Sequence, residues 1–250
     1  IPDSVTEIEE NAFCNCSSLT KITIPQSVTK IGESAFRECS KVVEIIFYSE
    51  MKIISNNIFY CNSSLREIKL PKEVEIIGEY SFYGCKNLEM IIIPPTVTIL
   101  KKSCFKGCSS LKTIEIPTSV QDIEIESFSG CTSFVEIHIP STVKHIGELT
   151  FEGCSSLEKI TINPYQTSVE SNAFSKCDKL KEMIINTNEL FTQQFNFKPF
   201  SMVTTITVPN NVVVIDKLTF KDCSSLTQIT INSKVESIEK SAFDGCTSLK

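Results

Sequence analysis

Cysteine is the residue type in this sequence with the widest chemical potential. The 250 residues include 12 cysteines, which could form disulfides, bind a metal ion or act as nucleophiles. Zinc and redox sites usually contain cysteines separated by two residues, and no such pair occurs. Cys14 and Cys16 are two positions apart, and Cys104 and Cys108 are four apart. The sequence therefore predicts no metal site and no cofactor.

The serines and threonines lack the partners that nucleophilic catalysis requires. A nucleophilic hydroxyl needs a base within hydrogen-bonding reach, and the only histidines are His138 and His145, seven positions apart. Most of the short polar residues that follow a cysteine are expected to bond to nearby backbone groups in turns. Since no base, nucleophile and orienting group can be assembled, we predict that the chain is not an enzyme.

The elements that carry these residues repeat every 23 positions. Phenylalanine marks the period through eleven copies without an insertion, at Phe13, Phe36, Phe59, Phe82, Phe105, Phe128, Phe151, Phe174, Phe197, Phe220 and Phe243. A cysteine follows three residues later in nine of the copies. A fixed period of this length is typical of solenoids, in which stacked coils bury a face that one coil cannot bury alone.

Each coil contains one clear strand signal. Ile22 and Ile24 alternate with a polar residue, as in a half-buried strand, and Pro25 ends the strand because it has no N–H for the ladder. The return path is too short for a long helix. We therefore predict a β-rich solenoid, a single domain over 1–250. It should have eleven coils, one long parallel sheet, and short strands or 3₁₀ turns on the opposite side.

The repeat also predicts the state of the cysteines. Equivalent side chains of stacked coils run parallel about a strand spacing apart, whereas a disulfide requires converging Cβ atoms about 3.8 Å apart. Free cysteine packs well as a small buried group. We expect a reduced, buried cysteine column; one or two local bridges or metal contacts are the alternative.

The repeat unit resembles the BspA-type leucine-rich repeat, also called the Treponema pallidum type. Residues 19–42, LTKITIPQSVTKIGESAFRECSKV, match that unit almost letter for letter, and the resemblance covers the whole chain. Such repeats occur in oral and gut bacteria and in mucosal protist parasites, and many members look like surface adhesins. The resemblance thus implies a cell-surface or secreted module that binds a host or microbial protein, such as an extracellular-matrix protein. It implies no catalytic residues.

Side chains that point outward from the predicted sheet are the candidates for binding. Ile46, Met90, Ile92 and Ile184 are apolar where a solvated face would be polar, and such residues flanked by charge are typical of protein-binding patches. The alternative is that isoleucine merely satisfies strand propensity. The candidate protein-binding residues are Glu44, Ile46, Glu67, Lys69, Met90, Ile92, Glu136, His138, Tyr165, Ile184 and Phe191.

Tyr165 and Phe191 belong to the irregular coils 162–207. There Pro199 and Phe200 replace the turn and cysteine residues of the repeat, and four phenylalanines lie within ten positions. One interpretation is drift, with Phe195 and Phe200 refilling core volume lost at Glu189 and Thr192. The other is a binding feature that leaves Tyr165 and Phe191 exposed side by side.

Charge and hydropathy exclude other classes of partner. The net charge of −6 argues against nucleic acid, and no apolar run approaches the roughly 20 residues of a membrane span. The cysteines would also suit a cytoplasmic interaction scaffold, which stays open as an alternative. The first residues begin in mid-coil, and Lys250 comes before the last strand is complete. We therefore expect either further natural sequence or end-to-end self-association of the chain.

Overall fold

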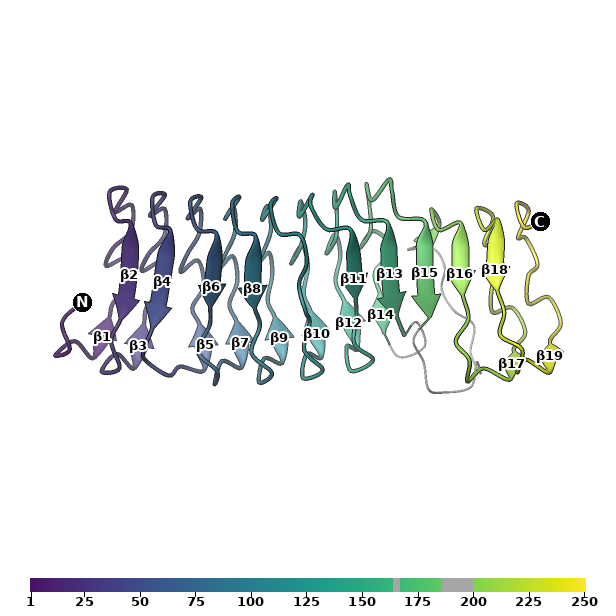
Figure 1. Ribbon diagram of the computed structural model, residues 1–250, viewed down its shortest axis with the longest axis horizontal. Coiled ribbons are helices and arrows are strands. Elements are labelled where there is room, and N and C mark those ends of the chain that lie inside the picture. Colours follow the sequence, from purple (N-terminus) through teal and green to yellow (C-terminus); the bar gives the residue numbers. More distant parts are fainter. Residues whose placement is uncertain (164–166, 186–199) are drawn as a thin grey trace.

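The chain folds into an elongated parallel β-solenoid with its two ends at opposite poles (Figure 1). The computed structural model describes residues 1–163, 167–185 and 200–250. Within these ranges there is no α-helix. Most coils contribute to two parallel ladders, one on each side, so the predicted solenoid of leucine-rich-repeat type, with short strands on its second side, is confirmed.

The longer strands form the front sheet. They are β2 (Lys21–Ile24), β4 (Glu44–Phe47), β6 (Glu67–Lys69), β8 (Met90–Ile92), β11 (Glu136–His138), β13 (Lys159–Ile162), β15 (Glu182–Ile185), β16 (Thr205–Thr207) and β18 (Gln228–Thr230). Paired strands are in exact repeat register; Ile137 of β11, for example, lies opposite Ile160 of β13. The alternation of the sequence therefore sends one set of side chains to the core and the other to solvent.

The back sheet consists of two-residue strands. They are β1 (Glu7–Ile8), β3 (Lys30–Ile31), β5 (Ile53–Ile54), β7 (Ile76–Ile77), β9 (Ile99–Leu100), β10 (Asp122–Ile123), β12 (His145–Ile146), β14 (Ser168–Val169), β17 (Val214–Ile215) and β19 (Ser237–Ile238). Six of them, from β5 to β14, form one unbroken ladder.

The front sheet is less continuous than predicted. It splits into three ladders, β2–β4, β6–β8 and β11–β13–β15–β16–β18. Nine of the eleven phenylalanine copies are followed by a front strand. Residues 112–116, which follow Phe105, form none, and the chain ends before a strand could follow Phe243. The described chain therefore makes about nine turns that carry a front strand, slightly fewer than the eleven expected.

Stacked phenylalanine rings form the spine of the core. The ring of Phe128 lies 5.5 Å from that of Phe105 and 5.4 Å from that of Phe151, at angles of 7° and 10°. All three side chains are fully buried. Offset-stacked aromatic pairs contribute about 0.5–1.5 kcal/mol beyond the burial of their area. The 23-residue period thus places a favourable ring contact at nearly every coil boundary.

Two columns of left-handed residues turn the chain on either side of this spine. The position two after phenylalanine has a positive φ at Gly84 and Gly130, and also at Glu38 and Lys176. The position two before phenylalanine has a positive φ as well. Its residues include Ser34 and Leu149 and no glycine, so this second column gave no signal in the sequence.

Phe200 occupies a cysteine position and lies in the core. It is buried, and its ring centroid is 5.1 Å from that of Phe174. This favours the interpretation of drift at that position, because the larger ring fills core volume. Tyr165, Glu189, Phe191, Thr192, Phe195 and Pro199 lie outside the described residues.

Candidate functional site

Outward side chains of the front sheet form two rows that run along the solenoid. In the first row Glu67 lies opposite Met90, and in the second Lys69 lies opposite Ile92, according to the register of β6 and β8. The rows continue on β11 with Glu136 and with His138. Equivalent residues of successive coils thus become neighbours on one surface.

Met90 and Ile92 are the most exposed apolar side chains in these rows. Their exposed fractions are 49% and 57%. They line a groove of 430 Å³ whose other wall contains Thr113, Glu115 and Pro117. The groove places two unburied apolar side chains beside polar groups, a composition found in the centres of protein interfaces.

The far wall of this groove is the segment without a strand, residues 112–116. In Figure 1 it lies between β8 and β11. Its backbone makes no backbone hydrogen bond with any described residue. Ile114 and Ile116 nevertheless remain buried in the core. Peptide N–H and C=O groups of an extended segment that have no partner in the protein require water or a ligand as partners.

A second groove opens on the other side of the same segment. It has a volume of 370 Å³ and is lined by Thr113, Glu115, Glu136, His138 and Ile184, among others. The two grooves share Thr113 and Glu115. The break in the ladder therefore joins the exposed pair on β8 to the outward side chains of β11, β13 and β15. We call this surface, from Glu67 to His138, the front patch.

The carboxylates of the front patch differ from those elsewhere on the same face. Glu44 pairs with Lys21 at 2.9 Å, and Glu182 pairs with Lys159 at 3.8 Å. Glu67, Glu115 and Glu136 form no ion pair with any described residue. The charged side chains in the two outward rows of the patch are these three carboxylates and the ammonium group of Lys69. The patch is acidic, with two negative charges in excess when His138 is neutral.

Most of the remaining candidates lie near the front patch without being exposed in the same way. Ile46 on β4 and Ile184 on β15 are half-buried. Glu44 is exposed, but it is engaged by Lys21. The structure therefore brings together Glu67, Lys69, Met90, Ile92, Glu136 and His138, with Ile184 at the edge. Tyr165 and Phe191 fall outside the described ranges.

The cysteines form the buried column that the repeat predicts. All 12 are free; eight are buried, and Cys14, Cys16, Cys61 and Cys246 are partly exposed. Burial raises the pKa of the Cys39 thiol to about 11 and that of Cys177 to about 12. A thiol with a raised pKa is a poor nucleophile and a poor metal ligand near neutral pH. The buried thiols of this column support the core.

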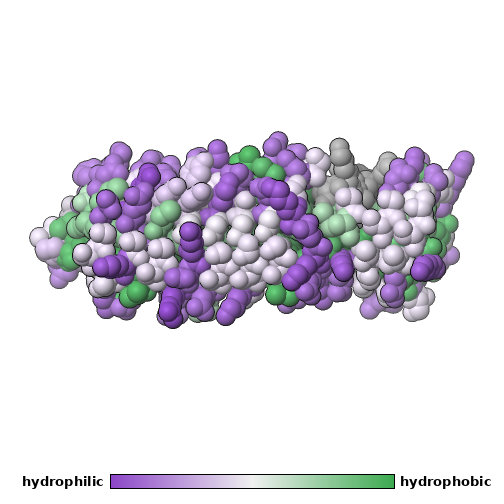
Figure 2. All heavy atoms as spheres, turned by 90° about the horizontal axis from the view of Figure 1, so that it is seen from above, coloured by the Kyte–Doolittle hydropathy of each residue, from purple (hydrophilic) through white to green (hydrophobic). Residues whose placement is uncertain are grey.

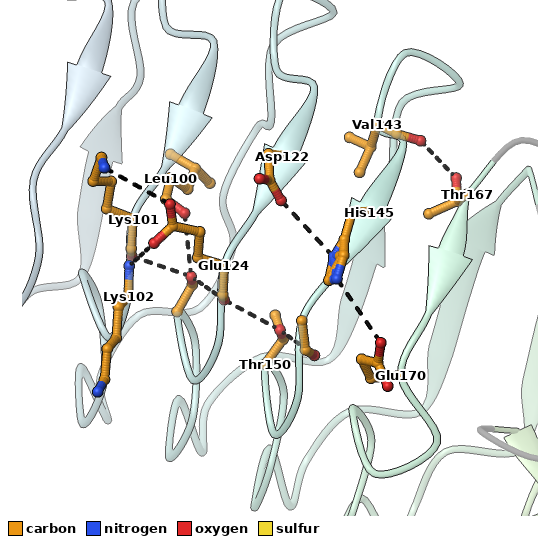
Figure 3. Close-up of polar contacts among 12 residues, drawn as sticks. Leu100, Lys101, Lys102, Asp122, Glu124, Val143, His145, Thr150, Thr167 and Glu170 are labelled. Atoms are coloured by element: carbon orange, nitrogen blue, oxygen red, sulfur yellow. Dashed lines mark hydrogen bonds and ion pairs between the residues drawn. The ribbon is translucent and has the colours of Figure 1, made fainter.

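The two histidines lie on opposite sheets, His138 on the front and His145 on the back. His145 lies between two carboxylates, 3.9 Å from Asp122 and 4.0 Å from Glu170 (Figure 3). Ser168 follows His145 in register on β14, so the fold creates an aspartate–histidine–serine row that sequence spacing did not reveal. No hydrogen bond joins Ser168 to His145 in the described chain, and the row lies outside the two front grooves. It lacks the geometry of a catalytic triad.

Polar contacts between coils are numerous around this part of the back sheet. The Glu124 carboxylate accepts a hydrogen bond from the Lys102 backbone N–H at 2.9 Å and lies 3.9 Å from the Lys101 ammonium. The Thr167 hydroxyl donates to the Val143 carbonyl at 2.9 Å (Figure 3). These side chains stabilise the stacking of coils. In this part of the back sheet, these polar side chains bond to neighbouring coils of the same chain.

Hydrophobic side chains form only small, separate groups on the surface seen from above (Figure 2). The described residues include no group of three or more His, Cys, Asp or Glu that could hold a metal ion. No helix in the described ranges is long and apolar enough to cross a membrane. Among the described features, the front patch has the composition best suited to binding another protein.

Fold and repeat define the class of protein as a leucine-rich-repeat solenoid. A family model described as "BspA type Leucine rich repeat region (6 copies)" matches residues 6–135 and 123–250. The chain belongs to this family, which confirms the resemblance inferred from residues 19–42. No curated protein matches it significantly in sequence.

Solved structures show the same fold. A leucine-rich repeat protein from Bacteroides ovatus is 26% identical, with a TM-score of 0.52 over 98% of this chain and 81% of its own. A leucine-rich cell surface protein from Faecalibacterium prausnitzii is also 26% identical, with a TM-score of 0.54 over 100% of this chain and 76% of its own. The pneumococcal vaccine antigen PcpA, 20% identical with a TM-score of 0.52 over 94% and 71% of the two chains, shares the fold.

Sequence reasoning missed the segment that shapes the front patch. Residues 111–117, LKTIEIP, follow the repeat pattern closely, with Ile114 and Ile116 in their regular positions. Nothing in those letters distinguishes a paired strand from an unpaired one. The break depends on how neighbouring coils are spaced, which a periodic pattern does not encode.

Proposed function

We propose that this chain is a protein-binding adhesion module at the cell surface or in the secreted space, and that its front sheet face binds a host or microbial protein. The observation that carries the proposal is the exposure of Met90 and Ile92 beside a groove on that face. Complete burial of a fully exposed side chain of this kind contributes about 1.5–3 kcal/mol, and roughly half of that is still to be gained at each of these half-exposed positions. Two neighbouring side chains of this kind give a partner a strong anchor.

Family and relatives support the surface location. The chain is a BspA-type repeat protein, and the F. prausnitzii relative is named as a cell surface protein. An extracellular-matrix or host surface protein is the partner that this location favours. Within this proposal the chain is a binding module and not an enzyme, since His138 and His145 lie on opposite sheets and neither accompanies a bonded nucleophile.

A cytoplasmic interaction scaffold is the second candidate. It is favoured by the twelve free cysteines, because thiols persist in reducing compartments. The two locations are distinguished by antibody labelling of cells that express the full-length protein. Labelling of intact cells supports the surface module, whereas labelling only after permeabilisation supports the scaffold.

Binding by the front face is tested with Met90→Thr/Ile92→Thr. Threonine already occupies the equivalent positions at Thr113 and Thr161, so the repeat accepts it. Beads that carry the purified chain are tested for adherence to epithelial cells and to immobilised matrix proteins. The matched control is Ile53→Thr on the back sheet, because Ile53 is 54% exposed.

The proposal predicts that the double variant loses at least tenfold in adherence while Ile53→Thr stays close to the unmodified chain. Both variants should unfold within a few degrees of the parent, since substitutions at exposed positions change stability by about 0.5 kcal/mol or less. Unchanged adherence of the double variant would contradict a role for the front face.

A further inference from the structure

We infer that the front patch recognises an extended segment of the partner protein in which two basic residues, four positions apart, flank a central apolar residue. The inference rests on the proposed function for the surface and adds the chemistry of the ligand. Three features carry it: an apolar groove, unpaired carboxylates on both sides of it, and backbone groups without partners along its wall.

The apolar residue of the ligand is assigned by the groove itself. Met90 and Ile92 lie at one wall and Pro117 at the other, over a volume of 430 Å³. That space accommodates one aliphatic side chain together with part of its backbone. The exposed faces of Met90 and Ile92 would lose their contact with water when it is filled.

The basic residues are assigned by charge complementarity. Glu67 and Glu136 lie at equivalent positions three coils apart, with Met90 and Thr113 between them in the same row. Neither carboxylate has an ion-pair partner among the described residues, in contrast to Glu44 and Glu182. A lysine or arginine placed over each of them would neutralise the excess charge of the patch.

The spacing follows from strand geometry. At the roughly 4.8 Å step of paired strands, three coil steps span about 14 Å, and four residues of an extended chain span about 13 Å. The two steps across the unpaired segment can only lengthen the first span, and the long side chain of lysine or arginine bridges the difference. A basic residue at each end therefore places the middle residue between Met90 and Thr113, which is where the groove lies. The ligand crosses the strands and runs along the solenoid axis.

The unpaired segment 112–116 supplies the third feature. Its N–H and C=O groups have no backbone hydrogen-bond partner in the described chain, and its residues wall both front grooves. A ligand that crosses this segment passes close to its unpaired peptide groups at one or two points, and Glu115 adds a carboxylate at the centre of the patch.

Lys69 determines which of the two outward rows a basic residue of the ligand can occupy. It lies opposite Ile92 in the second row and, among the described residues, is the only cation in the two outward rows from β6 to β11. A basic ligand residue is therefore favoured over Glu67 and disfavoured beside Lys69. The basic residues of the ligand are therefore expected over the row that contains Met90.

The test uses three labelled peptides with Gly-Ser flanks and measures binding by fluorescence anisotropy. Their central sequences are Lys-Thr-Leu-Thr-Lys, the acidic control Glu-Thr-Leu-Thr-Glu and the spacing control Thr-Lys-Leu-Lys-Thr. The unmodified chain should bind the first peptide at least tenfold more tightly than the acidic control and severalfold more tightly than the spacing control. Its affinity should fall as salt rises from 50 to 300 mM, because salt screens exposed charges.

Matched charge variants locate the site. Glu67→Gln/Glu136→Gln should weaken binding of the first peptide about tenfold, whereas Glu44→Gln/Glu182→Gln, which removes the same charge from the same face, should change it less than twofold. Equal binding of the basic and acidic peptides, undetectable binding of the basic peptide, or equal effects of the two double variants would overturn the inference.

Failure of this inference is distinguishable from failure of the proposed function. If the peptides show no preference while Met90→Thr/Ile92→Thr still abolishes adherence, the inferred ligand chemistry is wrong and the front face remains the binding surface. If adherence is unchanged in that variant, the proposed function itself is wrong.

Discussion

The thiol of Cys131 donates a hydrogen bond to the carbonyl oxygen of Phe105, 3.3 Å away and one coil earlier in the chain. The same contact joins Cys108 to Phe82 and Cys154 to Phe128. Each phenylalanine carbonyl also accepts the backbone N–H three residues later in its own coil. Buried thiols of the cysteine column therefore bond a coil to the one before it, which explains why free thiols recur with the period of the rings.

Burial of this column predicts slow modification of native thiols. Eight of the 12 cysteines are buried, so a thiol reagent should label at most four rapidly in the native protein and all 12 after denaturation. The four that react should be Cys14, Cys16, Cys61 and Cys246. Rapid labelling of Cys131 in the native state, identified by mass spectrometry, would show that the column is open to solvent.

The same burial predicts that stability falls in alkali. Burial raises the pKa of Cys39 to about 11 and of Cys177 to about 12, above the ordinary thiol value of 9.0. From about pH 9 upward the unfolded chain releases these protons while the native chain keeps them, which favours unfolding. The contribution is complete below pH 9 and is lost as pH rises toward the native pKa values.

Urea titrations between pH 8 and pH 10.5 measure this effect. The free energy of unfolding should decline over that range, and the decline should be shallower in Cys39→Ala/Cys177→Ala. Equal slopes for the two proteins would show that the buried thiols are not its source.

Removal of one ring from the spine should be costly. Phe128 stacks on two neighbours and is fully buried, so Phe128→Ala should destabilise the chain by about 3–5 kcal/mol. Hydrogen exchange should quicken in the adjacent coils, because stability in a solenoid depends on nearest neighbours. Phe243, which is partly exposed and stacks only on Phe220 among the described rings, provides the control and should cost less than half as much.

The left-handed column predicts opposite effects for two substitutions. Lys176 has a φ of 61° and Gly130 a φ of 73° at equivalent positions. A side chain in this region costs about 1–2 kcal/mol. Lys176→Gly should therefore raise the free energy of unfolding by roughly 1 kcal/mol, since its exposed ion pair with Glu152 contributes little. Gly130→Ala should lower it by a similar amount; changes of the same sign in both would contradict the argument.

Much of the fold could be predicted because one period governs it. The positions of Phe128, Cys131 and Ile137 within their coil fix their burial, and each is buried as the repeat requires. Outward positions such as Met90 and Ile92 were also identifiable from alternation. What the repeat could not predict is the loss of pairing at 112–116 and the pairing state of Glu67 and Glu136, because both depend on distances between coils.

The central claim is that the front patch contacts the partner, and site-specific cross-linking tests it most directly. A photoreactive side chain is placed at position 92 in one protein and at position 53 in another, since both sites are about equally exposed on opposite sheets. Each protein is irradiated while bound to epithelial cells or matrix protein, and cross-linked products are measured. The account predicts a discrete cross-linked partner from position 92 and at least tenfold less from position 53. Equal yields from the two positions, or a product from position 53 alone, would contradict it.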